Sequence, residues 1–172
     1  MQVSLPGLLS QLLLGLVNGS FYAILSLGLA VIFGLLNVIN FAHGALFMMG
    51  AVLTWMAMTY WNVSYWVMLV AAPVMVGLFG ILIERLLLRW IYKLDHLYGL
   101  LLTLGLTLLI EGAFRSFYGV SGLAYDTPES LEGAMNLGFM MLPKYRVWVV
   151  VASLVVCFAT WFVIEKTRLG AY

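Results

Sequence analysis

Five long runs of apolar residues make up most of the chain, and short polar stretches separate them. The runs cover residues 8–36, 44–61, 65–88, 97–118 and 146–164. A helix of about 20 apolar residues is long enough to cross the hydrocarbon core of a bilayer. Lipid cannot satisfy backbone polar groups, so a long spanning segment pairs these groups within itself, as a helix does. The pattern predicts an all-α fold, a transmembrane helical bundle of about five spans in one domain, residues 1–172.

Polar side chains cluster where the first run meets the second. Asn37, Asn40 and His43 lie three residues apart, among residues that are otherwise hydrocarbon. In a helix that spacing places them on roughly one face, and in a membrane such a face must point toward protein or water. We therefore expect a break or tight turn near residues 37–43. These three residues are candidates for a translocation path or gate, with Asn18 of the first run as a weaker candidate.

A second interpretation of this cluster stays open. The three side chains could simply hold the helix break to its neighbours through hydrogen bonds. In that case they would contribute to stability and have no contact with a solute.

A polar stripe marks the fourth run, because Thr103, Thr107, Glu111 and Arg115 recur at every fourth residue. Glu111 lies seven residues from the end of the run, which is about 10 Å at 1.5 Å per residue. It is either a pore-lining or gate residue, or one member of an ion pair with Arg115 that reaches the membrane surface.

The longest polar stretch, residues 119–145, is predicted to be an external loop. It contains three carboxylates, those of Asp126, Glu129 and Glu132. Pro128 suits the first position of a helix, and acidic residues are favoured in a first turn. A short amphipathic helix is therefore expected within this loop.

Composition places the chain in the class of integral membrane proteins. Of its 172 residues, 65% are hydrophobic and only 9% are charged, whereas soluble domains carry about 25% charged residues. The mean hydropathy is +1.09. The first charged residue is Glu84, so the first half of the chain depends on uncharged groups for any polar function.

The basic residues predict an orientation, because cytoplasmic loops of membrane proteins carry an excess of Lys and Arg. The predicted cytoplasmic residues are Arg85, Arg89, Lys93, Lys166 and Arg168, and the predicted external residues are Arg115, Lys144 and Arg146. Five spans with a cytoplasmic end after the fifth place the N-terminus outside.

The sequence lacks the motifs for nucleotide binding, zinc binding and nucleophilic catalysis. No Gly-Lys-Ser/Thr loop that would bind a nucleotide phosphate is present. One cysteine and two separated histidines do not make a standard zinc site, and no nucleophile–base set is apparent. We expect no enzyme activity, no cofactor and no nucleic-acid partner. A pump of this kind would take its energy from a partner subunit.

Several stretches carry a family resemblance. VINFAHGALFMMGA at residues 38–51 resembles the characteristic stretch of bacterial branched-chain amino acid ABC transporter permeases. The first long span of that family is similar to GLVNGSFYAILSLGLAVIFG at residues 15–34. IERLLLR, LLLTLGL and KTRLG, at residues 83–89, 100–106 and 166–170, are supporting matches in the same order.

The resemblance implies a multi-pass permease subunit in the bacterial inner membrane that works by alternating access. It implies four kinds of partner: a second related permease, cytoplasmic ATP-binding subunits, a periplasmic binding protein and the lipid bilayer. The implied solute is leucine, isoleucine or valine, although permeases for urea, amides and other amino acids resemble the same family.

In that family the Thr-Arg-Leu-Gly stretch precedes a cytoplasmic segment that docks on the ATPase, followed by further spans, whereas this sequence ends at Tyr172. We therefore expect a truncated, partial or split permease that cannot by itself couple ATP hydrolysis to uptake. Two other interpretations stay open: a secondary transporter or channel, and a remnant that transports nothing.

Overall fold

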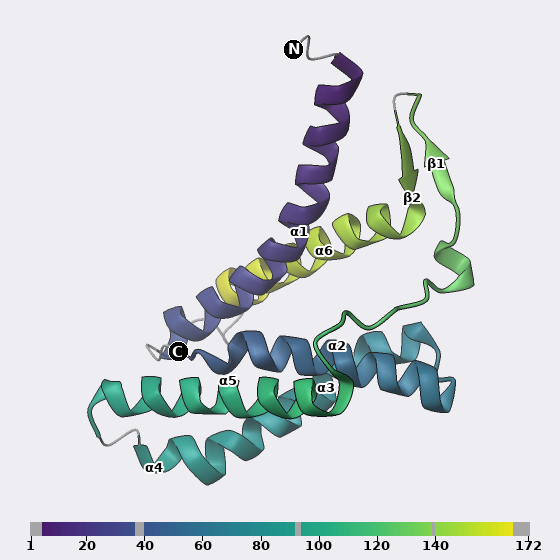
Figure 1. Cartoon of the computed structure of the whole chain (residues 1–172). Helices are drawn as coiled ribbons and strands as arrows, with labels where there is room; N and C mark the ends of the chain where they lie inside the picture. Colours follow the sequence, from purple (N-terminus) through teal and green to yellow (C-terminus); the bar gives the residue numbers. More distant parts are fainter. Residues whose placement is uncertain (1–4, 37–39, 92–93, 139, 167–172) are drawn as a thin grey trace. The chain divides into compact units, whose positions relative to one another are not determined.

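A computed structural model describes residues 5–36, 40–91, 94–138 and 140–166, and the chain forms two compact units (Figure 1). One unit consists of Met1–Leu27 and Asp126–Tyr172, and the other of Gly28–Tyr125. Five helices in the described residues are long and apolar enough to cross a membrane: Leu5–Gly34, Ala42–Trp61, Tyr65–Ile91, Leu97–Tyr118 and Lys144–Lys166. The predicted transmembrane bundle of about five helical spans is confirmed.

The unit Gly28–Tyr125 is built around α2 (Ala42–Trp61), which packs against α3 (Tyr65–Ile83) and α5 (His96–Tyr118) (Figure 1). The buried residues Ala42, Ala45, Met49 and Val52 of α2 recur at helical spacing. They therefore form one inward face. Two of the four are alanines, and small side chains let helix backbones approach closely in a membrane.

A three-residue connection joins α2 to α3. Asn62 ends α2 in the left-handed conformation, with φ of 49°, which Asn tolerates better than most residues. The Val63 N–H donates to the carbonyl of Ala57 at 3.1 Å. Next to this turn, Ala57 packs with Met68 and Ala72 of α3 in a small apolar core.

The third span contains more than one kind of helix. α3 continues through Pro73 and is followed by a π-helical segment, η1 (Glu84–Leu88), and by the short α4 (Arg89–Ile91). The Arg89 N–H donates to the carbonyl of Glu84, five residues earlier, which is the π pattern. The helical span thus runs to Ile91, three residues beyond the apolar run.

In the other unit, residues 5–27 of α1 (Leu5–Leu36) contact α6 (Lys144–Lys166) through two buried serines. The Ser153 hydroxyl donates to the carbonyl of Ser20 at 2.9 Å, and the Ser20 hydroxyl donates to the carbonyl of Val17 at 2.6 Å. Small residues with hydrogen-bonding side chains are typical of helix contacts in membranes.

The predicted external loop differs from the expectation. It contains a 3₁₀ turn, η2 (Glu129–Leu131), and an antiparallel pair, β1 (Ala134–Asn136) and β2 (Met141–Pro143). The expected amphipathic helix is wrong beyond that single turn, because Glu132 is already extended and Gly133 has a positive φ of 93°.

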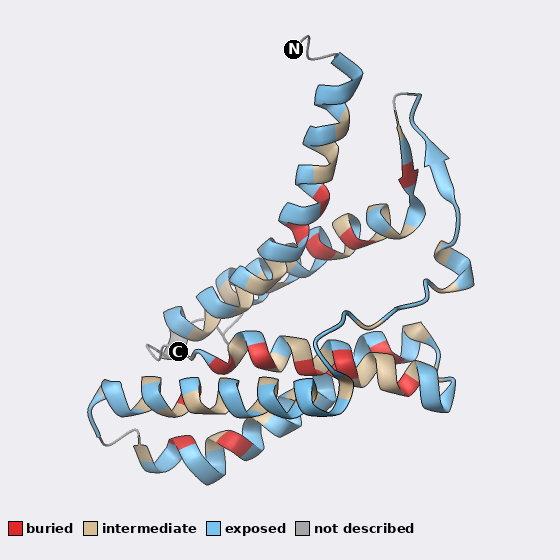
Figure 2. Ribbon diagram, in the orientation of Figure 1, coloured by how far each residue is buried: buried red, intermediate tan, exposed pale blue. Residues whose placement is uncertain are grey.

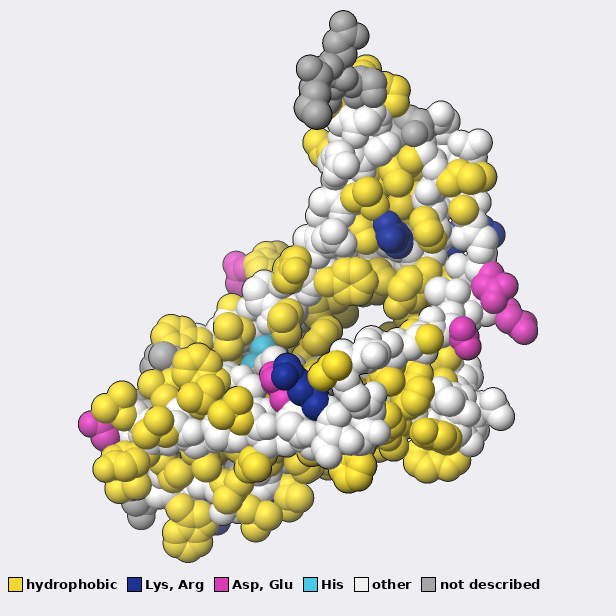
Figure 3. All heavy atoms as spheres, viewed as in Figure 1, with side chains coloured by type: hydrophobic (Ala, Val, Ile, Leu, Met, Phe, Trp, Pro, Cys, Tyr) yellow, Lys and Arg dark blue, Asp and Glu magenta, His cyan; other side chains and the backbone are white. Residues whose placement is uncertain are grey.

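Most large apolar side chains of the helices are exposed, and buried positions are few in both units (Figure 2). Leu12 and Leu109 are each 72% exposed. Hydrophobic side chains spread over the visible surface of the helices, and charged ones occur in small groups (Figure 3). Such surfaces suit lipid as the surrounding medium.

Candidate functional site

The described structure of the predicted break comprises Asn40 and Phe41, before the start of α2 at Ala42, and Leu36 is the last described residue of α1. Asn40 lies two residues before Ala42. Its side-chain oxygen accepts a hydrogen bond from the Ala42 N–H at 2.9 Å, and its carbonyl accepts one from the His43 N–H at 3.4 Å. The first amides of a helix have no partner within it. The Asn40 side chain therefore makes an Asx turn that begins α2.

A second helix supplies the next partner. The Phe41 N–H donates to the hydroxyl of Thr103 in α5 at 3.3 Å, and the same hydroxyl donates to the carbonyl of Leu100 at 3.1 Å. Thr103 is completely buried, with 0% of its surface exposed. The start of α2 is thus bonded to α5 as well as capped by its own chain.

His43 faces a third helix. A Cβ atom built on Gly28 of α1 would lie 2.7 Å from Cε1 and 2.9 Å from Nε2 of His43. The imidazole ring therefore lies directly against the backbone of α1 and is half-buried there. Only glycine at residue 28 leaves room for the ring in this position.

Two further predicted site residues lie outside this part of the described structure. Asn37 lies outside the described residues. Asn18 is exposed on α1 and belongs to the unit formed by Met1–Leu27 and Asp126–Tyr172. Of the predicted residues, the described structure brings together Asn40 and His43.

Glu111 pairs with its own helix. Its carboxylate lies 3.7 Å from the guanidinium of Arg115, one turn later in α5. The two side chains are 37% and 68% exposed, respectively. The polar stripe of α5 therefore runs from the buried Thr103 to an exposed ion pair.

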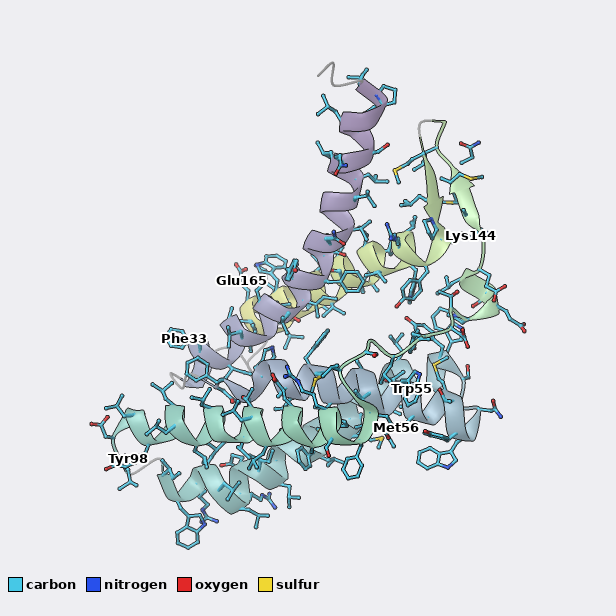
Figure 4. The ribbon with its side chains drawn as sticks, viewed as in Figure 1. Phe33, Trp55, Met56, Tyr98, Lys144 and Glu165 are labelled. Atoms are coloured by element: carbon cyan, nitrogen blue, oxygen red, sulfur yellow. The ribbon has the colours of Figure 1, made fainter. Side chains whose placement is uncertain are left out.

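An aromatic group lies at the other end of α2. The rings of Trp55 and Tyr118 are 5.6 Å apart between centroids, in edge contact, and Trp55 makes a similar contact with Tyr60 at 5.8 Å. The Trp55 indole also donates to the carbonyl of Ala124 at 2.8 Å (Figure 4). α2 is therefore joined to α5 near both of its ends.

The polar groups of the break are suited to hydrogen bonding. They comprise a carboxamide, a hydroxyl and an imidazole. Among the described residues, no group of three or more His, Cys, Asp or Glu side chains could hold a metal ion. The carboxamide, the hydroxyl and the imidazole can each donate or accept hydrogen bonds.

Sequence reasoning included Thr103 in the polar stripe but assigned the candidate role to Glu111. The distance of Glu111 from the end of the apolar run favoured it as a path residue, whereas in the structure Thr103 is the buried member of the stripe. The position of Thr103 at the head of the stripe was the available signal. The buried Ser153 was missed, because a single serine in an apolar run does not indicate its partner.

Known proteins resemble the chain over most of its length. The family described as "Branched-chain amino acid transport system / permease component" matches residues 11–172. The permease protein BraD of the high-affinity branched-chain amino acid transport system of Pseudomonas aeruginosa is 26% identical over 173 residues, covering 94% of this chain and 56% of that protein. LivH, the corresponding protein of Escherichia coli, is 29% identical over 111 residues, covering 60% of this chain and 36% of LivH.

The chain spans about half the length of BraD. No solved structure matches it. The family match covers residues 11–172 and includes the helix break, the polar stripe and all of α6. The chain is a multi-pass membrane protein that belongs to the family of branched-chain amino acid transport permeases.

Proposed function

We propose that this chain forms membrane-spanning helices of the permease of an ABC importer for branched-chain amino acids. The observation that carries the proposal is the family match over residues 11–172. The five apolar helices support it, since they provide the spans that a permease needs. The solute class comes from BraD and LivH, whose names describe high-affinity branched-chain amino acid transport.

In this proposal the solute passes between helices by alternating access, beside the break that precedes α2. Asn40 and His43 contribute hydrogen-bonding groups there, and Asn37, Asn18 and Glu111 are further path or gate candidates. Hydrogen-bonding groups suit an amino acid, whose ammonium and carboxylate groups need partners when they leave water. A polar group within a membrane span is costly unless it serves such a role or is paired.

The energy for transport comes from separate subunits. The sequence has no nucleotide-binding loop of the Gly-Lys-Ser/Thr type, so ATP hydrolysis is assigned to cytoplasmic ATP-binding partners and the chain is not itself an enzyme. A second permease and a periplasmic binding protein complete the proposed assembly. Its place is the bacterial inner membrane.

Uptake of labelled solutes tests this function. Cells that carry this chain as part of a complete permease, together with its natural partner subunits, should accumulate labelled leucine, isoleucine and valine, and deletion of the gene should abolish the saturable part of this uptake. Uptake should depend on ATP and persist when ion gradients are dissipated. Loss of uptake with the ion gradient alone would indicate a secondary transporter and contradict the proposal.

Two variants of Asn40 test its role in the path. Ser retains an oxygen that can accept the Ala42 N–H, whereas Ala does not. We expect Asn40→Ser to keep normal protein abundance but to lower leucine uptake by roughly 2- to 12-fold, the range for one lost hydrogen bond. Asn40→Ala should lose uptake and also lower abundance, because loss of a helix cap costs about 0.5–2 kcal/mol.

The comparison distinguishes a path residue from a structural one. If Asn40→Ser transports like the original protein while Asn40→Ala is poorly abundant, Asn40 only caps α2. Abundance is measured by immunoblotting of membranes, and uptake is expressed per amount of chain.

A further inference from the structure

Thr103 is the one fully enclosed side chain among the described residues of α5. Its exposed fraction is 0%. The rest of the span Leu97–Tyr118 is half-buried or exposed. The other stripe residues are less enclosed: Thr107 and Glu111 are half-buried and Arg115 is exposed. The packing of α5 in this unit is therefore tightest at a hydroxyl group.

The bonding of this hydroxyl is specific to its type. A hydroxyl has one proton to donate and lone pairs to accept with. The Thr103 proton goes to the carbonyl of Leu100 at 3.1 Å, and its oxygen accepts from the Phe41 N–H at 3.3 Å. Ser could make both bonds, whereas Val, which has nearly the same shape as Thr, could make neither.

The bond from Thr103 reaches the backbone directly before α2. Phe41 lies between Asn40, whose side chain accepts the Ala42 N–H, and Ala42, the first residue of α2. The Phe41 N–H is one of the helix-end donors that the helix cannot satisfy. Since residues 40–43 are adjacent, a displacement of Phe41 would also displace the Asn40 cap and the His43 ring that lies on Gly28.

We propose that Thr103 is a positioning residue of the transport path. Its hydroxyl fixes the start of α2 against α5, and Asn40 and His43 are thereby held where the solute passes. This inference rests on the proposed permease function. Thr103 acts through the backbone of the break and has no contact with solute of its own.

Three substitutions test the inference. Thr103→Val removes the hydroxyl at constant shape, and Thr103→Ser restores it. Thr107→Val is the matched control, because the Thr107 hydroxyl donates to the carbonyl of Thr103 within its own helix at 2.9 Å. Both valine variants lose one hydroxyl from the same face of α5, but only one of them loses the bond to the break.

The first readout is hydrogen exchange at the Phe41 amide, in the full chain held in lipid nanodiscs. Hydrogen bonds between membrane helices protect by an average of about threefold and at most about twentyfold in equilibrium terms. Thr103→Val should raise the exchange rate of this amide by about that range, while Thr103→Ser and Thr107→Val leave it unchanged. An unchanged Phe41 rate in Thr103→Val would overturn the inference.

The second readout is leucine uptake in cells with the natural partner subunits. At matched abundance, Thr103→Val should lower the maximal rate by about threefold or more, Thr103→Ser should restore it, and Thr107→Val should leave it intact. Normal uptake by Thr103→Val would overturn the positioning role while the permease function stands. Absence of uptake in the unaltered protein would overturn the permease function, and the positioning role with it.

Discussion

The imidazole of His43 and the backbone of α1 meet at Gly28, without any atom between them. An added Cβ at this glycine would lie 2.7 Å from His43 Cε1, closer than a carbon–carbon contact of about 3.5–4.0 Å allows. The ring lies at the end of a rotatable side chain, so it would turn away while the helices keep their places. The spacing of polar residues predicted His43, but it gave no indication of the glycine opposite.

Substitution of Gly28 tests this contact. Gly→Ala within a helix is worth about 0.5–1 kcal/mol in favour of the helix, and a side chain forced off its rotamer costs about 0.5–1.5 kcal/mol. Gly34→Ala has open space around the new methyl group and should raise the thermal stability of the purified chain. Gly28→Ala should gain less or lose stability, and it should lower leucine uptake because His43 is displaced.

Equal stability and equal uptake of the two alanine variants would contradict this contact. Both variants make the same chemical change in α1, so the comparison isolates the effect of the His43 ring. Uptake is measured per amount of chain in the membrane.

At the scale of whole elements, α2 is connected to α5 by different chemistry at its two ends. The start of α2 uses the hydroxyl of Thr103, and the far end uses the ring of Trp55. Trp and Tyr favour the membrane interface, where an apolar ring can keep its polar atom bonded. The Trp55 indole provides this bond to Ala124, in the segment that leaves α5.

Trp55→Phe should release that segment and keep the ring contact. Phe retains an aromatic face for Tyr118 but has no N–H for the Ala124 carbonyl, and one such bond is worth about 0.5–1.5 kcal/mol. We expect chymotrypsin to cut between residues 119 and 125 roughly 2- to 12-fold faster. Trp61→Phe is the control, since Trp61 is 71% exposed. Equal cleavage of the two variants would show that the indole bond does not hold the segment.

The sequence predicted the helices well, because the length of an apolar run is nearly sufficient to define a membrane span. The observed ends of the helices differ from the ends of the apolar runs by a few residues, where polar caps and turns are present. α2 begins at Ala42, two residues before the apolar run, because the Asn40 oxygen satisfies an amide there. The strands of three residues, Ala134–Asn136 and Met141–Pro143, were not predicted, since so short a segment shows no alternation of apolar and polar residues.

The candidate site was only partly predictable for a related reason. A polar residue within an apolar run can be recognised in the sequence, and Asn40 and His43 were predicted as site residues in this way. Their partners are not visible, because the bond between Phe41 and Thr103 joins residues 62 positions apart. Such a bond depends on which helices pack together. Helix packing in lipid depends on the shape of the helix surfaces and on small residues, more than on the spacing of apolar and polar residues along the sequence.

At the scale of the whole molecule, the distribution of basic residues predicts the orientation of the spans. The connection between α4 and α5 is predicted to lie in the cytoplasm and the segment after α5 outside. Cys157 is the only cysteine, so the variant Cys157→Ser has no thiol and a single cysteine can be introduced at any chosen position. Ser121→Cys should react with an impermeant maleimide on spheroplasts, and Leu94→Cys only after the membrane is opened.

Both new cysteines must react in opened membranes, which controls for a thiol that is buried. The reverse pattern would invert the orientation. Labelling of both from outside would contradict α5 as a complete span.

The π-helical segment Glu84–Leu88 has a consequence that concerns residue count. A π turn has the form that one inserted residue leaves in an α-helix, and one residue corresponds to about 100° of rotation at 3.6 residues per turn. The segment holds that extra residue within one wider turn, so removal of a single residue from it would restore ordinary winding and leave Arg89 and the exposed Trp90 on nearly the same side of the helix. Removal of a residue from the regular α-helix of α3 would instead turn both side chains by about 100°, so the third span can lose one residue without such a rotation only at the π-helical segment.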